Sequence, residues 1–215
     1  MKVKQLLFVI AMGSLATACS NIEHSRDLAN PKVSGTTIAQ QVCSLCHGID
    51  GNSTSPNFPN LAGQQPAYFM AQMREFRGHS RLDPTGFEYM WGLSRSLTDD
   101  QIKGLANYFS AQEVASAPGL IKDGAAIAAG RSIFEQGVPD KGVPACGTCH
   151  GAQAKGNEQF PQLAHQHADY LTKQLMVFQR TEERPEGSIM KTVAHELTRK
   201  NMQDVSAYLQ EFPVK

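Results

Sequence analysis

Two copies of the spacing Cys-x-x-Cys-His stand in the two halves of this chain of 215 residues. They are Cys43, Cys46 and His47 in the first half and Cys146, Cys149 and His150 in the second. On a helix, residues three and four positions apart lie near one another, so both thiols can bond one porphyrin edge while the imidazole reaches the iron. The pattern therefore predicts covalent attachment of haem c through two thioethers, with the histidine as an axial ligand.

The same cysteine spacing has other uses. A Cys-x-x-Cys pair can be half of a zinc site or a redox dithiol. Here both copies are followed by glycine, Gly48 and Gly151, and by further matching sequence, in a chain with only five cysteines and seven histidines. We therefore expect two haem c groups and treat zinc or chance as the weaker interpretation.

An iron held by one histidine needs a sixth ligand, or it keeps an open position where a substrate can react. A ligand required in both halves should recur in the repeat, and Met90 falls on Met190 when the two halves are aligned. The remaining candidates have no like counterpart: Met70, Met73, Met176, Met202, His79, His165, His167 and His195. We expect His47 with Met90 and His150 with Met190 as axial pairs, a ligation that raises the reduction potential.

A second repeated stretch lies between the haem motif and the next helix. Phe58 to Ala62 reads FPNLA, and Phe160 to Ala164 reads FPQLA. It could simply pack beneath the haem edge. An axial histidine, however, usually donates its other ring N–H to a carbonyl that fixes the ring. The carbonyls of Pro59 and Pro161 are the candidates for this contact.

Helical periodicity supplies the elements that position these residues. In the first half we expect helices from about Thr36 to Cys46, from Gln65 to Phe76 and from Thr98 onward, the last opened by a capping box of Thr98 and Gln101. In the second half we expect them over 123–135, 167–180 and 198–209.

We expect Met90, Trp91 and Met190 on loops, and an added loop over 137–144. Trp91 is expected to wall the haem pocket, because Lys191 stands at its place in the second half. No strand pattern appears, so the fold class is all-α, with two similar domains packed as a pseudo-symmetric pair.

The N-terminus predicts export. Residues 1–18 have a short basic start, an apolar stretch too short to span a bilayer, and an Ala-Thr-Ala end that suits a signal peptide. Cys19 follows directly and resembles the lipidated cysteine of bacterial lipoproteins; the alternative is cleavage that leaves a free thiol. Residues 19–35 are polar and suit a tether.

Composition adds the domain limits and excludes one class of partner. The formal net charge is zero, so nothing indicates a nucleic acid. The repeat divides the chain into a domain over 36–113, a linker over 114–122 and a second domain over 123–215. A membrane is expected as a partner only through a lipid on Cys19.

Together these motifs resemble a dihaem cytochrome c of the c4 type, built from two class I cytochrome c domains in tandem. The resemblance runs from about residue 36 to the C-terminus. It rests on the doubled CxxCHG, on the stretch from Asn57 to Gln64 with its copy, and on a methionine seven residues before each Leu-Thr. It implies two low-spin haems with exposed edges that meet at the domain interface, a periplasmic location, and electron transfer from a quinol-oxidising cytochrome bc complex toward terminal oxidases. Two departures are His165, where the first half has Gly63, and Cys19, which suggests a membrane-tethered carrier.

The sequence leaves three functions open. An electron carrier needs no catalytic acid, base or nucleophile, and no such group repeats or clusters here. A dihaem enzyme, such as a peroxidase or a sulfur-compound dehydrogenase, would require unlike ligation of the two irons. The third function is that of a docked cytochrome subunit in a membrane oxidoreductase complex, which Cys19 would suit.

Overall fold

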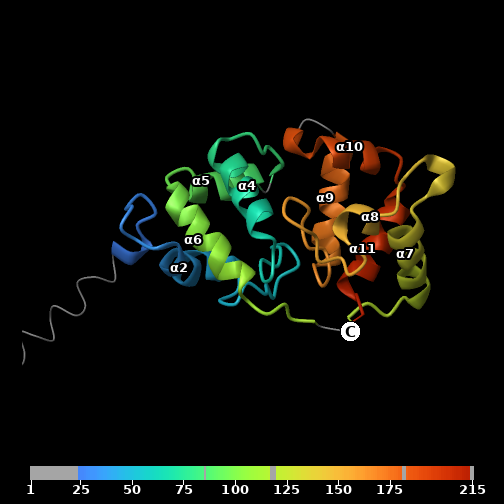
Figure 1. Ribbon diagram of the computed structural model, residues 1–215, viewed down its shortest axis with the longest axis horizontal. Coiled ribbons are helices and arrows are strands. Elements are labelled where there is room, and N and C mark those ends of the chain that lie inside the picture. The colour runs from blue at the N-terminus through green and yellow to red at the C-terminus, as the bar shows by residue number, and fades with distance from the viewer. Residues whose placement is uncertain (1–23, 85, 117–119, 181–182, 214–215) are drawn as a thin grey trace, which may run out of the picture.

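The computed structural model describes residues 24–84, 86–116, 120–180 and 183–213. Within these ranges the chain is helical and contains no strand, only two isolated β-bridges. Figure 1 shows two helical domains side by side, the blue-to-green first half and the yellow-to-red second half. The prediction of an all-α chain with two similar domains is confirmed. The predicted signal peptide and Cys19 lie outside the described residues.

The first domain is built from short helices around the haem motif and two longer ones. Its helices are α2 (Gly35–Ile38), a π-helical turn (Ala39–Cys43), α3 (Ser44–His47), α4 (Pro66–Arg77), a second π-helical turn (Gly86–Met90), α5 (Trp91–Ser94) and α6 (Asp99–Ser110). A short 3₁₀ turn, His24–Arg26, precedes them.

The second domain repeats this order. Its helices are α7 (Gly124–Gln136), α8 (Gly147–His150), α9 (Ala168–Arg180), α10 (Ser188–His195) and α11 (Arg199–Gln210), with 3₁₀ turns at Pro139–Lys141 and Pro185–Gly187. The added loop of this domain is closed by a bridge between Val138 and Val143.

Local chemistry explains where the longer helices begin. Pro66 occupies the first turn of α4, where its missing N–H costs nothing. Thr98 caps α6 in a capping box with Gln101, as expected, and Thr198 does the same for α11 with Asn201. These caps set the register of the helix that closes each domain.

The expectation of loops around the two methionines was wrong. Met90 ends the second π-helical turn, Trp91 begins α5, and Met190 lies within α10. The helix-breaking prolines, Pro84 and Pro185, stand at the start of each segment. A proline is tolerated in the first turn of a helix. The residues that follow each proline are then free to continue as helix.

Each domain has its own core, formed where its first and last helices cross. Gly35 of α2 lies against α6, and Gly130 of α7 lies against α11. A Cβ atom on Gly130 would stand 1.9 Å from the backbone oxygen of Asp204, so only glycine permits this approach. Phe109 and Phe134 are fully buried at the centres of the two cores. No helix in the described part of the chain is both long enough and apolar enough to cross a membrane.

Candidate haem sites

Both histidines of the haem motifs are fixed in the same way. The Nδ1 atom of His47 lies 2.9 Å from the carbonyl oxygen of Pro59, and that of His150 lies 3.0 Å from the carbonyl oxygen of Pro161. These are the two carbonyls that the sequence singled out. With Nδ1 donating to the carbonyl, each ring presents Nε2 as its free nitrogen. This is the orientation that a histidine ligand of a metal usually adopts.

Burial keeps the two imidazoles neutral. His47 and His150 are 8% and 6% exposed. Burial lowers the pKa of each ring below 6.5, against the smaller opposing effect of the hydrogen bond to the carbonyl. Neutral imidazole is the form that binds iron, so these side chains fit an axial position.

None of the four cysteines of the two motifs forms a disulfide. Burial raises the pKa of Cys43 to about 12 and that of Cys146 to about 11. A reactive dithiol needs the opposite, a lowered pKa. Among the described residues, no cluster of three or more His, Cys, Asp or Glu side chains is arranged to hold a metal ion. The pairs therefore suit thioether attachment better than a redox or zinc site.

The two methionines singled out by the repeat are half-buried. Met90 packs against the first core, the same cluster that Cys43 contacts. Met190 lies in the first turn of α10, in the segment that follows Arg184. Their places on matching helical segments keep both as candidates for the sixth ligand.

Trp91 makes contacts that the sequence did not predict. Its ring stacks on His79 at a centroid distance of 4.9 Å, and His79 stacks in turn on Phe87 at 4.8 Å. The guanidinium of Arg95 lies 5.6 Å from the centre of the Trp91 ring. Trp91 is thus part of a layered aromatic group in the first domain, and its role as a pocket wall stays a prediction.

The loop after each histidine-fixing carbonyl has one backbone geometry in both domains. Gly63 donates its N–H to the oxygen of Phe109 at 2.9 Å, and His165 donates to Leu209 at 2.8 Å. Both residues have positive φ, 64° and 60°. This conformation favours glycine, so His165 carries strain that Gly63 avoids.

These loops also join the two domains. Asn60 donates its N–H to Oε1 of Gln166 at 2.8 Å, and Nε2 of Gln166 returns a bond of 2.9 Å to the oxygen of Asn60. Gln162 and Gln64 make the reciprocal pair, at 2.8 Å and 3.2 Å. Asn60 and Gln162 each follow a histidine-fixing proline, so the histidine side of both sites adjoins the domain interface.

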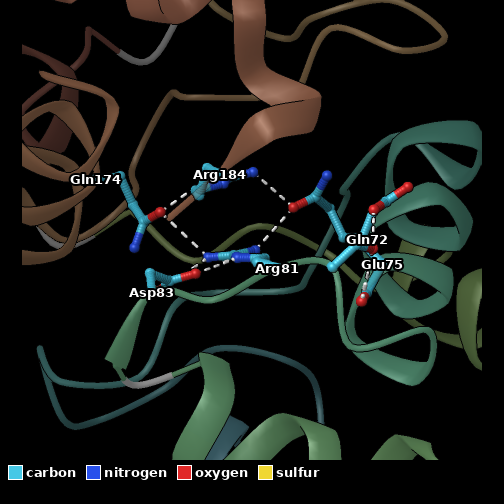
Figure 2. A network of polar contacts seen from close by, with 7 residues as sticks. Gln72, Glu75, Arg81, Asp83, Gln174 and Arg184 are labelled. Atoms are coloured by element: carbon cyan, nitrogen blue, oxygen red, sulfur yellow. Dashed lines mark hydrogen bonds and ion pairs between the residues drawn. The ribbon is translucent and has the colours of Figure 1, made fainter. Parts of the chain in front are cut away.

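A buried polar cluster joins the domains on the methionine side, and sequence reasoning missed it. Arg81 and Arg184 stand on the segments that lead to Met90 and Met190, and each is 5% exposed (Figure 2). Their guanidiniums lie over the rings of Phe76 and Phe178, at 4.4 Å and 4.5 Å from the ring centres. The aligned glutamines Gln72 and Gln174, which accept from these arginines, were the only signal in the sequence.

Known proteins are similar to this chain in sequence and in structure. Residues 33–112 and 127–212 match the family model described as Cytochrome c. Cytochrome c-552 of Acidithiobacillus ferridurans is 39% identical over 168 residues, covering 78% of this chain and 72% of that protein. Cytochrome c4 of Stutzerimonas stutzeri is 37% identical over 181 residues, covering 79% of this chain and 83% of that protein.

The similarity extends to three dimensions and to a relative with a different name. The solved structure of Acidithiobacillus ferrooxidans cytochrome c4 has a TM-score of 0.74 and 38% identity, covering 79% of this chain and 98% of the other. The relative from Thiomonas intermedia named "Thiosulfate dehydrogenase electron acceptor" is 32% identical over 175 residues, covering 80% of this chain and 79% of that protein.

Proposed function

Because the chain belongs to the cytochrome c family, as a dihaem protein like cytochrome c4, we propose that it carries electrons in the periplasm as part of a respiratory chain. Its donor would be a quinol-oxidising cytochrome bc complex, and its acceptor a terminal oxidase or reductase. Two covalently attached haem c groups are its cofactors.

The observation that most supports a carrier is that the two axial histidines have the same hydrogen bond and the same burial. Both donate Nδ1–H to a proline carbonyl at nearly the same distance, 2.9 Å and 3.0 Å, and both are buried. An enzyme that reacts at one haem would need two unlike sites. Equivalent sites suit two irons that each pass one electron.

The proposed ligands follow from this symmetry. Cys43 and Cys46 hold the first haem and Cys146 and Cys149 the second, with axial pairs His47–Met90 and His150–Met190. When bound, each haem supplies a one-electron couple between ferric and ferrous iron. The residues around it keep water out and hold the imidazole in one orientation, so that little has to move when the electron arrives.

Carbon monoxide binding tests the carrier directly. The reduced holoprotein should show no rapid change of its visible spectrum with carbon monoxide, because both sixth positions are filled. A change that amounts to about half the haem would mean that one iron is open, and the enzyme alternative would then replace the carrier.

A second donor has its own support. The Thiomonas intermedia relative is named an electron acceptor of thiosulfate dehydrogenase. A sulfur-compound dehydrogenase could therefore reduce this chain, either as a free carrier or as a docked subunit. Stopped-flow reduction by a purified cytochrome bc complex with quinol, compared with reduction by a thiosulfate dehydrogenase with thiosulfate, decides between the donors.

The export signal and the lipid belong to the same proposal. A signal peptide over 1–18 and a lipid on Cys19 would place the carrier on the periplasmic side of the membrane. Mass spectrometry of the mature N-terminus should find a diacylated or triacylated Cys19, and Cys19→Ser should release the protein into the soluble periplasmic fraction. If Cys19 were unmodified and the protein were found in the membrane-free extract, the lipid anchor would be contradicted and the carrier would diffuse freely.

A further inference from the structure

The buried cluster between the domains has the symmetry of the repeat. Oε1 of Gln72 accepts from Arg81 of its own domain at 2.7 Å and from Arg184 of the other at 2.6 Å. Oε1 of Gln174 accepts from Arg184 at 2.7 Å and from Arg81 at 3.1 Å (Figure 2). Each arginine therefore bonds to both domains, and each glutamine to both arginines.

The two guanidiniums in this cluster are permanently charged. A guanidinium stays protonated at any physiological pH. Burial opposes the charge of Arg81, but its neighbours, Asp83 among them, outweigh burial and raise its pKa further. Nε of Arg81 donates to Oδ1 of Asp83 at 2.6 Å. Water and salt screen such buried charges much less than surface charges.

The cluster stands where both haem sites approach the interface. On the histidine side, Asn60 and Gln162 follow the prolines that fix His47 and His150, and both bond across the interface. On the methionine side, the N–H of Leu82 donates to the oxygen of Glu183 at 2.7 Å, next to the two arginines. The domains thus also meet at the two arginines, which stand at the start of the segments that lead to Met90 and Met190.

We propose that Arg81 and Arg184 form one electrostatic unit shared by the two haems, so that each arginine raises the reduction potential of the haem in the other domain as well as that of its own. Reduction adds an electron to the iron site, and a fixed cation nearby favours the added negative charge. This inference rests on the proposed function, because it requires two haems ligated as described.

The test is Arg184→Met in the holoprotein, with both haems followed separately. Redox titration gives the two potentials, and the paramagnetically shifted haem methyl protons identify each haem, with Met190→Ala to assign the second. The expected result is a lower potential for both haems. The equilibrium constant for reduction of the first haem should fall on the order of tenfold, the size of effect that removal of one weakly screened charge produces. Arg81→Met should lower both potentials in the same way.

Two controls separate charge from structure. Arg184→Lys keeps the cation and should keep most of the potential of the first haem, although it loses the forked hydrogen bonds. Arg131→Met removes an exposed cation of the same domain, paired with Glu135 at 2.9 Å, and should leave both potentials unchanged.

Three results would overturn the inference: a shift confined to the second haem in Arg184→Met, an equal shift in Arg184→Lys, or a full shift in Arg131→Met. If Arg184→Met yields no holoprotein, Arg184→Gln removes the same charge but keeps a side chain that can form hydrogen bonds. Both potentials should then fall, and two unchanged potentials would overturn the inference. Carbon monoxide binding by the wild type reports on the proposed function alone, so the two ideas fail separately.

Discussion

The side-chain amide of Gln64 closes a two-bond ring on the backbone of Gln162 in the other domain. Its Oε1 accepts from the N–H at 2.8 Å, and its Nε2 donates to the carbonyl oxygen at 3.2 Å. The side-chain amide of Gln166 makes the same two bonds with the backbone of Asn60. The two glutamine side chains thus form hydrogen bonds with backbone N–H and C=O groups of the other domain. The interface would otherwise bury these backbone groups unpaired.

The first prediction removes both rings. Gln64→Ala with Gln166→Ala deletes four hydrogen bonds across the interface, each contributing about 0.5–1.5 kcal/mol. Calorimetry of the holoprotein should show the domains unfolding in two separate transitions at lower temperature. Gln112→Ala breaks a bond to Tyr108 inside the first domain and is the matched control. A single transition like that of the wild type in the double variant would contradict the role of these amides.

The second prediction concerns the sixth ligands. Met190→Ala should open the second iron, so that carbon monoxide binds to about half of the reduced haem and the potential of that haem falls steeply. Met90→Ala should do the same for the first haem. Met176→Leu is the control, because Met176 has no methionine counterpart in the repeat. Absorption spectra that stay unchanged in Met190→Ala would remove this residue from the ligand set.

The third prediction follows the charge of Asp83. Burial raises the pKa of this carboxyl, but Arg81 and Arg184 outweigh burial and hold it below 3.8. A carboxyl with a lowered folded pKa stabilises the fold fully above its unfolded pKa, and this contribution is lost as pH falls through the folded value. Asp83→Asn should therefore destabilise the holoprotein by about 3 kcal/mol or more at pH 7, as loss of one partner of a buried pair does.

The difference between Asp83→Asn and the wild type should narrow as pH falls below 3.8. Denaturant unfolding at neutral and acid pH measures both stabilities. Asp99 is the control carboxylate: it pairs with Arg77 at 2.7 Å but is exposed, so Asp99→Asn should have a small effect at any pH. If the difference in stability between Asp83→Asn and the wild type stayed constant down to about pH 2, well below the usual carboxyl range, the lowered pKa of Asp83 would be contradicted.

The fourth prediction tests the helix crossing in the second domain. A Cβ on Gly130 would stand 1.9 Å from the oxygen of Asp204, so Gly130→Ala has to push α7 away from α11. We expect a loss of about 1–3 kcal/mol or more, the usual cost of overpacking. Gly124→Ala lies on the same helix with nothing within 4 Å of the new Cβ, and stability should stay the same or rise slightly. Equal thermal midpoints for the two variants would argue against a close crossing.

Much of the site was predictable because its chemistry depends on short spacings. Thr98 with Gln101 predicted a capping box, and the structure contains it. The repeated prolines pointed to Pro59 and Pro161 as hydrogen-bond acceptors because an axial histidine needs a carbonyl at this position. The equivalence of Gly63 and His165 followed from the same alignment, and their backbone bonds agree. The all-α class followed from periodicity alone.

The remainder depends on contacts between distant segments. Arg81 follows Phe76 by five residues and Arg184 follows Phe178 by six, so an ungapped repeat does not align the two arginines. Only the fold brings both guanidiniums to the same pair of glutamines. The helices that hold Met90 and Met190 were missed because Gly and Pro beside them indicate loops in a short window. Gly130 looks like any helical glycine until α11 crosses it.

The reciprocal rings of Gln64 and Gln166 describe an interface of a particular symmetry. When position i of one domain contacts position j of the other and j contacts i, the surface is isologous, as in a two-fold homodimer. A single domain with these residues would present a self-complementary face to a second copy of itself. The linker predicted over 114–122 would then contribute mainly to kinetics and entropy, because it would turn an encounter of two molecules into an intramolecular one at high effective concentration. Cutting that connection should leave two halves that still recognise each other.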